Sequence, residues 1–353
     1  MQIKYTKKDV IKLFSEETPP FIVAEMSGNH RGSLNNALDI VRAAADAKVG
    51  AIKIQTFTAD TMTININKNE FMANSKSAWK GKNLYQLYQE SSTPKEWHAP
   101  IFELCKELGI FAFSSPFDPR AVDFLETLNV PFYKLASFEI IDIPLVEKIA
   151  STGKPMIIST GMATEDEIQD AVYTAKKNGC KNIILLKCTS AYPSEPKDIN
   201  LSTIPYLKKK FNCLVGLSDH TLGVGVSIAS VAYGASVIEK HLTLDRSQGG
   251  VDNTFSMEPD EMKLLVKETS RAWYAKGIPY IGPVGVAEKA ARLKRRSLYV
   301  VKDISEKEII TNENIRSIRP GYGLHTKYLK DLLGKKAIKN IKKGTPTSWN
   351  LFE

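Results

Sequence analysis

The sequence has few cysteines and no long apolar segment. Its four cysteines show no CxxC spacing, so a zinc cluster or a disulfide framework is not expected. We interpret them as reduced core thiols: Cys105, Cys180, Cys188 and Cys213. No window approaches the roughly 20 apolar residues of a membrane span, and the charged start MQIKYTKKDV does not resemble a signal peptide. These absences predict a soluble, cytoplasmic protein.

The sequence also lacks a glycine-rich dinucleotide-binding motif, GxGxxG, after its first apolar run, and this bears on which parallel-sheet fold is expected. Eight short apolar runs recur in the first 240 residues: FIVAE, AIKIQ, FAFSS, FYKLA, PMIIST, IILLK, CLVGL and SVIEK. Helical periodicity lies between most of them, and one helix is opened by a capping box from Thr164 to Glu167. Apolar strands that alternate with helices indicate a parallel sheet covered on both faces. Because no GxGxxG follows the first run, eight units predict a closed (β/α)8 TIM barrel rather than an open doubly wound sheet.

The chain is expected to contain two domains. Residues 1–281 form the predicted barrel, residues 282–296 a basic linker, and residues 297–353 a small domain of short strands in which KDISEKE and KNIKKGT echo each other. Within the barrel, residues 58–95 form an unusually long connection that includes Trp79 and ends near a predicted capping box at Thr93–Glu96. A connection of this length is typical of a lid or of a small packed subdomain.

The positive charge is concentrated at the C-terminal end. The chain carries a formal net charge of +9, and residues 288–353 hold 16 Lys and Arg against 7 Asp and Glu, which accounts for all of it. A basic tail can bind nucleic acid or an acidic membrane, but here the cations alternate with apolar residues instead of forming an unbroken block. We therefore predict no nucleic-acid or membrane partner, and a tail that handles a small anion or is solvated.

Polar residues follow the apolar runs, where the strands of a barrel end. The C-terminal ends of barrel strands meet at one mouth, which is where barrel enzymes place their chemistry. A single serine there is more often a helix N-cap, and a single lysine is usually solvated. Their convergence instead favours a cradle for phosphate and carboxylate groups. The strand-end residues include Glu25, Lys53, Gln55, Ser115, Lys134, Ser137, Glu139, Ser159, Ser190, Tyr192, Ser218 and Glu239.

Two of the five histidines follow neighbouring strands. His220 ends the stretch GLSDH and His241 ends SVIEKH, one βα unit apart, so both are expected at the same mouth. A single histidine at a strand end is more often a hydrogen-bonding core residue. Two on adjacent strands, with carboxylates near, favour a divalent metal whose remaining positions are open to water and substrate.

The motifs that carry these residues resemble the sialic acid synthase family over essentially the whole chain. The matching stretches are EMSGNHRGSL, KIQTFTADTMT, FSSPFD, YKLASFE, ISTGMAT, LLKCTSAYP, GLSDHTLG and IEKHLTLD. RPGYGLH resembles part of that family's C-terminal antifreeze-like (SAF) domain. EMSGNH and GGVDNTFSMEP are most similar to the pseudaminic acid branch of the family.

The resemblance implies condensation of phosphoenolpyruvate with an open-chain amino sugar, which for this branch is a 2,4-diacetamido-2,4,6-trideoxy-L-altrose. It assigns Mn or Mg to His220 and His241, and an acid/base or orienting role to Glu25. The implied phosphoenolpyruvate-binding residues are Lys53, Ser115, Lys134, Ser137, Ser159, Ser190 and Ser218. The implied sugar-binding residues are Gln55, Glu139, Tyr192, Asp252 and Arg319. Arg319 resembles an arginine that enters the partner subunit's barrel, which implies a domain-swapped homodimer.

Several alternatives remain open at this point. Lys53 or Lys134 would form a Schiff base in a metal-independent aldolase barrel, and the basic tail would bind a polyanion in a non-enzymatic protein. Within the family, N-acetylneuraminic and legionaminic acid synthases use other sugars. The sequence leaves open the acceptor, the preferred metal, the lid residues that contact the sugar, and whether the product enters a surface glycan or modifies flagellin.

Overall fold

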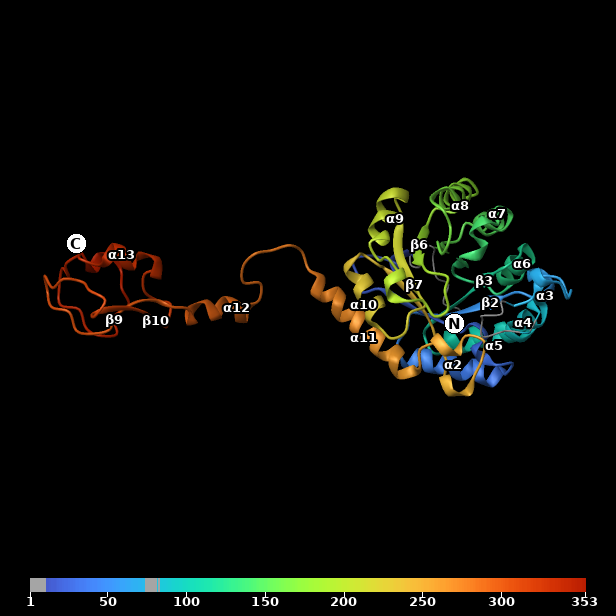
Figure 1. Cartoon of the computed structure of the whole chain (residues 1–353), viewed down its shortest axis with the longest axis horizontal. Helices are drawn as coiled ribbons and strands as arrows, with labels where there is room; N and C mark the ends of the chain where they lie inside the picture. Colours follow the sequence, from blue (N-terminus) through green and yellow to red (C-terminus); the bar gives the residue numbers. More distant parts are fainter. Residues whose placement is uncertain (1–10, 74–80, 82) are drawn as a thin grey trace. The chain divides into compact units, whose positions relative to one another are not determined.

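The computed structural model describes residues 11–73, 81 and 83–353, so Trp79 in the long connection lies outside the described residues. The chain divides into two compact units, Met1–Gly277 and Ile278–Glu353 (Figure 1). No helix in the described ranges is long and apolar enough to cross a membrane. Each unit has its own hydrophobic core.

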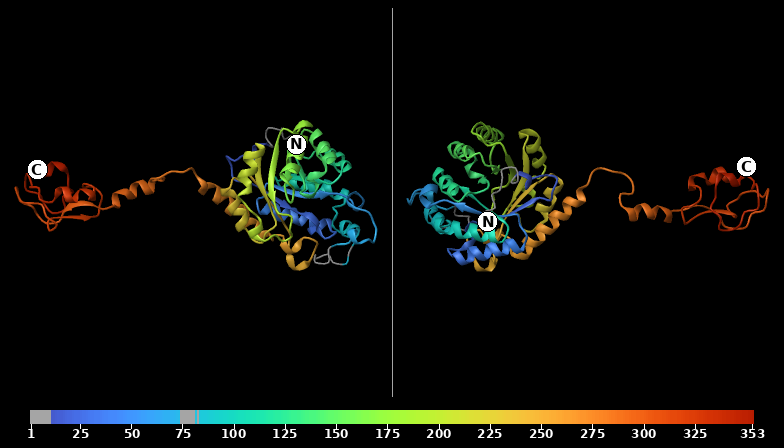
Figure 2. Two further views of the ribbon diagram at one scale, coloured as in Figure 1. Left: turned by 45° about the horizontal axis from the view of Figure 1, so that its top comes forward. Right: turned by 180° about the vertical axis from the view of Figure 1, so that it is seen from behind.

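The first unit is a closed barrel of eight parallel strands in sequential order, which confirms the predicted fold class. Parallel pairing of β8 with β1 closes it, with His241 opposite Glu25. Figures 1 and 2 show the helices arranged around the outside of the strands. The strands are β1 (Phe21–Glu25), β2 (Ala51–Thr56), β3 (Phe111–Pro116), β4 (Tyr133–Leu135), β5 (Met156–Ser159), β6 (Ile183–Cys188), β7 (Leu214–Asp219) and β8 (Val237–His241).

Amphipathic helices connect the strands and pack their apolar faces on the barrel. They are α2 (Leu34–Asp46), α5 (Lys95–Glu107), α6 (Pro119–Thr127), α7 (Ile143–Ser151), α8 (Glu165–Lys177), α9 (Thr203–Phe211), α10 (Gly225–Ala232) and α11 (Pro259–Lys276). The capping box predicted at Thr164–Glu167 is confirmed at the start of α8. The one predicted at Thr93–Glu96 is wrong, because Pro94 is the N-cap of α5 and the Thr93 hydroxyl instead lies 3.4 Å from His30 Nε2.

The long connection after β2 contains short helices of its own. These are α3 (Ala59–Met62), the 3-10 turn η2 (Asn69–Phe71) and α4 (Leu84–Ser91). The Tyr85 hydroxyl donates to Asp60 Oδ1 across α3 and α4 at 3.0 Å, and Tyr88 packs edge-on against Phe57 at the end of β2. The described part of the connection therefore forms a small packed subdomain beside the barrel mouth.

The second unit is built on the two segments whose sequences echo each other. Ile304 and Ile341 exchange backbone hydrogen bonds at 2.8 Å in both directions. Asp303 accepts from the Lys343 amide and Asn340 from the Glu306 amide, so the two echoing loops cap each other in the same way. The regular elements are β9 (Ser297–Val300) antiparallel to β10 (Ile315–Ile318), with α12 (Val286–Ala291) and α13 (Leu329–Leu332). Part of the predicted linker is thus helical.

Candidate active site

The barrel interior changes from apolar to polar along each strand. Side chains of a strand alternate between its faces, so every second residue points inward. Aromatic and aliphatic residues fill the N-terminal end of the interior, where Phe14 packs edge-on against Phe21 and Phe132. At the other end the inward positions are polar, and strand register sets Glu25 beside Lys53 and Ser218 beside Glu239. The inward residues nearest the mouth are Glu25, Lys53, Ser115, Lys134, Ser159, Cys188, Ser218, Glu239 and His241.

Lys53 lies between two carboxylates among these inward-facing residues. Its Nζ is 2.8 Å from Glu25 Oε2, 3.6 Å from Glu239 Oε1 and 3.4 Å from Ser115 Oγ, and the three charged side chains are almost fully buried. Burial by itself lowers the pKa of Lys53, but Glu239 and Glu25 outweigh it and raise that pKa. Burial raises the pKa of Glu25, and Lys53 only partly offsets it. Lys53 is therefore a permanent cation in the mouth.

Lys134 supplies a second buried cation on the opposite strands. Its Nζ donates to Ser159 Oγ at 2.7 Å and to the Leu135 carbonyl at 2.9 Å, and burial lowers its pKa. Ser137 and Ser190 face each other beside it, with their hydroxyl oxygens 2.9 Å apart. Two cations ringed by hydroxyls form a site suited to an anion that carries both a phosphate and a carboxylate.

Gly161 allows the loop after β5 to approach this cradle. Its φ is +47°, and a Cβ at this position would lie 2.4 Å from Ser137 Cβ and 2.7 Å from Ser190 Oγ. We expect Gly161→Ala to displace both serines and to raise the KM for an anionic substrate about 10-fold or more, because a 1.4 kcal/mol loss of binding is tenfold. Steady-state kinetics would show this as a rise in KM.

The control for that prediction is Gly109→Ala. Gly109 also has a positive φ, +77°, but a Cβ there would meet no described atom within 4 Å. Both substitutions strain the backbone, and only Gly161→Ala crowds the cradle. Equal KM values in the two variants would show that Gly161 does not shape the site.

His220 and His241 come together at the mouth. Their ring centroids are 5.3 Å apart, and Tyr192 and Phe255 pack against them at 4.5 Å and 4.9 Å. His220 Nδ1 lies 3.0 Å from the Thr189 carbonyl, which makes that nitrogen the donor. Burial by itself lowers the pKa of His220, but hydrogen bonds to the Cys188 side chain and the Thr189 carbonyl outweigh it and raise that pKa. His241 Nδ1 is buried with no hydrogen-bond partner among the described residues. Burial, with the nearby His220, lowers the pKa of His241 well below its usual value, so its ring is neutral.

His241 is thus a neutral imidazole with an unused buried nitrogen, which is the form that binds a metal ion, and the His220 ring lies beside it, so this pair of residues fits a divalent cation. Within the described ranges, no group of three or more His, Cys, Asp or Glu side chains is arranged to hold one. The two histidines would therefore be the protein's contribution, with the other positions taken by water or substrate.

A further group of polar side chains lies on the β1–β2 side of the mouth. Gln55 Nε2 donates to Glu25 Oε1 at 2.9 Å and to Ser27 Oγ at 3.2 Å, and the Ser27 hydroxyl donates to Asp252. Glu139, after β4, has its pKa raised to about 7 by burial, and its Oε2 is buried without a hydrogen bond to any described residue. These groups offer acceptors and donors for a polar second substrate.

Arg319 belongs to the second unit, Ile278–Glu353. It lines a cavity of about 650 Å³ within Ile278–Glu353, together with Arg292, Arg295 and Arg296. All the other site residues predicted from the sequence lie at or beside the barrel mouth.

Two residues of the mouth have contacts that the sequence did not predict. Glu239 ends a predicted strand, and in the structure it contacts Lys53 and accepts from Ser218 at 3.1 Å. Cys188 is a buried thiol, as the sequence predicts, but it also hydrogen-bonds the His220 side chain. Burial by itself raises the pKa of Cys188, but His220 and Lys134 outweigh it and lower that pKa. The alternation of side chains along a strand could have identified both residues. Glu239 lies two residues after the inward-facing Val237, and Cys188 lies two residues after the inward-facing Leu186.

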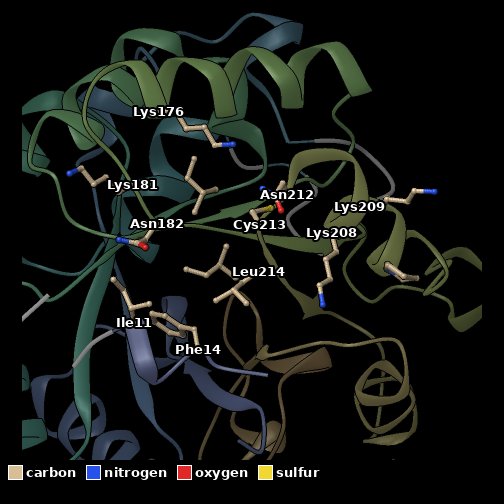
Figure 3. Close-up of a pocket in the computed structure, with 13 residues that line it drawn as sticks. Ile11, Phe14, Lys176, Lys181, Asn182, Lys208, Lys209, Asn212, Cys213 and Leu214 are labelled. Carbon is tan, nitrogen blue, oxygen red and sulfur yellow. The ribbon is translucent and has the colours of Figure 1, made fainter. Parts of the chain in front are cut away.

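A separate cavity of about 600 Å³ opens at the opposite end of the barrel, at the starts of β6 and β7 (Figure 3). It is lined by lysines from the last turns of α8 and α9. Lys176 Nζ donates to the Phe211 carbonyl at 3.4 Å, and Lys208 pairs with Glu16 at 2.6 Å. Lysines in these positions neutralise carbonyls at helix ends, and none of the predicted site residues lies there.

The fold and the mouth together define a class: a (β/α)8-barrel enzyme with a cationic, hydroxyl-rich mouth, followed by a small C-terminal domain. Comparison with known families then makes the assignment specific. Residues 40–279 match the NeuB family and residues 295–353 match the SAF domain, so the chain belongs to the NeuB family, which is the sialic acid synthase family whose motifs it resembles.

Individual relatives match nearly the whole chain. It is 45% identical over 94% of its length to pseudaminic acid synthase of Campylobacter jejuni, covering 96% of that protein. It is 44% identical to pseudaminic acid synthase of Helicobacter pylori, covering 94% of this chain and 97% of that one. A crystal structure of N-acetylneuraminic acid synthetase from Leptospira borgpetersenii matches with a TM-score of 0.69 and 35% identity, over 77% of this chain and 90% of that one.

Proposed function

We propose that the chain is a pseudaminic acid synthase, a transferase that condenses phosphoenolpyruvate with 2,4-diacetamido-2,4,6-trideoxy-L-altrose and releases phosphate. The observation that carries the proposal is the barrel mouth, in which two buried lysines and a set of hydroxyls adjoin two neighbouring imidazoles. Similarity to pseudaminic acid synthases over nearly the whole chain supports the choice of acceptor. Phosphoenolpyruvate is a cytoplasmic metabolite, which agrees with the cytoplasmic location predicted above.

Phosphoenolpyruvate binds in the cationic half of the mouth. Lys53 and Lys134 supply the charge that a phosphate and a carboxylate require, and both are buried, so their fields are little screened by water. Hydroxyl groups from five strand ends and loops supply directed donors. They belong to Ser115, Ser137, Ser159, Ser190 and Ser218.

His220 and His241 would hold the divalent metal ion. The Thr189 carbonyl orients His220 through Nδ1, and Tyr192 and Phe255 pack on the rings, which limits their rotation. Bound Mn or Mg supplies Lewis-acid stabilisation to the oxygen of an aldehyde. The neutral state of His241 is the state that ligation requires.

The reaction joins the two substrates and then splits off phosphate. The methylene carbon of phosphoenolpyruvate forms a bond to the aldehyde carbon, whose oxygen takes up a proton from solvent, and positive charge develops at C2 of the enolpyruvate. Water adds at C2, and Glu25 accepts the proton that it loses. The C2–O bond to phosphate then breaks, the C2 hydroxyl loses its proton, and a 2-keto acid remains. Burial raises the pKa of Glu25, and Lys53 only partly offsets this, so the carboxylate takes up a proton more readily than an exposed one would.

The acceptor is held on the other side of the mouth. Gln55, Glu139, Tyr192 and Asp252 face it from four different segments, and Arg319 is contributed by a C-terminal domain. The described part of the long connection, residues 58–73 and 83–95, adjoins the sugar side of the mouth. Its Tyr88 lies close enough to Glu139 for that carboxylate to raise the pKa of the Tyr88 hydroxyl, after the larger effect of burial.

Glu139 should make the use of the sugar depend on pH. Its pKa of about 7 means that the carboxylate, which accepts hydrogen bonds from the sugar's N–H and O–H groups, forms as the pH rises from about 6 to 8. We expect kcat/KM for the sugar to rise through this range in the wild type, and Glu139→Gln to remove that limb. The check is the ratio of the two pH profiles, which cancels the ionisation of phosphoenolpyruvate. A constant ratio would exclude Glu139 as the titrating group.

Arg319 acts in the barrel of a second subunit, so the enzyme is a domain-swapped homodimer. Arg319→Ala should leave a dimer with impaired use of the sugar, and His220→Ala should inactivate the barrel. When both variants are unfolded together and refolded, mixed dimers hold one site with an intact barrel and an intact arginine. We expect activity well above that of either variant alone, measured as phosphate release. If Arg319 served its own barrel, mixing would restore nothing.

The test of the proposed function is an assay of phosphate release with three acceptors, with and without EDTA. The trideoxy-altrose sugar should be used best, and EDTA should stop turnover. Preference for the N-acetylneuraminic or legionaminic acid precursor would move the chain to those branches. Lys134, whose pKa burial lowers, is the lysine that a Schiff-base aldolase would use. Borohydride trapping with pyruvate, together with activity in EDTA, would favour that mechanism instead.

A further inference from the structure

A buried ion pair joins β7 to β8 on the outer face of the barrel, directly behind the two histidines. Asp219 and Lys240 are opposite each other in the strand register, and Asp219 Oδ2 is 3.0 Å from Lys240 Nζ. Each side chain is 1% exposed or less, so the pair is shielded from water. The pair immediately precedes His220 on one strand and His241 on the other.

The Asp219 carboxylate closes a turn around His220. Its Oδ1 accepts from the Thr221 amide at 2.9 Å and from the Thr221 hydroxyl at 2.8 Å, so the residues before and after His220 are tied together. Its Oδ2 also accepts from Ser227 Oγ on α10 at 2.6 Å. Lys240 Nζ donates to the Thr221 carbonyl at 2.6 Å, which links this turn to the residue before His241.

We propose that the Asp219–Lys240 pair is a positioning device that sets the placement of the His220 and His241 rings, and thereby the affinity for the metal. The inference rests on the proposed metal site. Within the described residues, the His241 ring has no hydrogen bond at Nδ1, so the backbone that carries it must do much of the positioning. Buried ion pairs add little net stability, because desolvation offsets their attraction, and their best-attested use is to specify one arrangement.

The test replaces the pair and measures metal binding by itself. In the full-length Asp219→Val/Lys240→Met protein, with folding checked by circular dichroism, we expect Mn²⁺ affinity in an EPR titration to fall about 10- to 100-fold, the usual effect of losing such a supporting partner. Asp219→Asn/Lys240→Met keeps an oxygen for the Thr221 amide but loses the Lys240 link to the Thr221 carbonyl, and should recover only part of the affinity. If the first variant does not fold, Thr221→Ala must weaken Mn²⁺ binding, since it removes a donor to Asp219.

The matched control is Glu126→Leu/Lys154→Met. This pair, 2.6 Å apart, joins α6 to the start of β5, at the end of the barrel away from the histidines. Its removal should leave Mn²⁺ affinity unchanged. Wild-type Mn²⁺ affinity in Asp219→Val/Lys240→Met, or in Thr221→Ala if that variant is needed, would overturn the positioning role of the pair and leave the proposed metal site standing. Failure of the wild type to bind Mn²⁺, or unchanged binding in His220→Ala, would overturn the proposed metal site as well.

Discussion

Replacing His220 or His241 by alanine is expected to reduce phosphate release by at least about 1,000-fold, even with excess Mn²⁺, since a loss of about 4 kcal/mol of transition-state stabilisation is a factor of that size. The reason is the small number of ligands. The two imidazoles are the proposed ligands, and the described residues hold no cluster of three metal-binding side chains. Removing one leaves a single protein ligand, which extra metal in solution cannot replace.

The same variants should lose Mn²⁺ binding in an EPR titration, which separates loss of metal from loss of fold. His98→Ala is the matched control. His98 is also buried, and burial lowers its pKa to about 4, but both of its ring nitrogens are used, against Thr56 Oγ1 at 2.8 Å and the Pro94 carbonyl at 3.0 Å. Its loss should lower stability and leave Mn²⁺ affinity unchanged. Full activity in either active-site variant would refute the metal assignment.

Replacing Lys53 by methionine is expected to damage both stability and substrate binding. It would leave Glu25 and Glu239 facing each other in a buried site, and breaking such an ion pair costs about 3–5 kcal/mol. Without Lys53, burial and the neighbouring Glu239 raise the folded-state pKa of Glu25 further above the unfolded value. The folded state then binds more protons, so the deficit is largest at neutral and higher pH and shrinks as the pH falls. Urea unfolding at pH 8 and pH 5 would show this difference.

A second substitution separates the two effects of Lys53. In Lys53→Met/Glu239→Gln one carboxylate is neutral, so most of the stability should return, whereas the KM for phosphoenolpyruvate should stay at least about 10-fold raised because the cation is still absent. Lys148→Met removes a partly exposed partner of Asp123 and should cost no more than about 1 kcal/mol. A wild-type KM in the double variant would exclude Lys53 from the phosphate site.

Much of the fold could be predicted from local patterns. All eight apolar runs are strands, within one or two residues at each end, because a strand that is buried on both faces must be apolar along its length. The helix cap at Thr164 was also predictable, because it depends only on Thr164 and on Glu167 three residues later. The cap at Thr93 was not, because the adjoining Pro94 takes the N-cap position and the Thr93 hydroxyl turns to the buried His30.

The sequence by itself determined the strand and helix order, the family and the residues gathered at the mouth, since each of these depends on neighbouring residues. Tertiary structure alone decided which of those residues touch. Glu25 meets His241 because β1 pairs with β8, and Lys53 lies between Glu25 and Glu239 because three strands bring them to one level. Glu25 and His241 are more than two hundred residues apart in the sequence, and no local periodicity encodes such a contact. They arise when the barrel closes and each buried charge must find a partner.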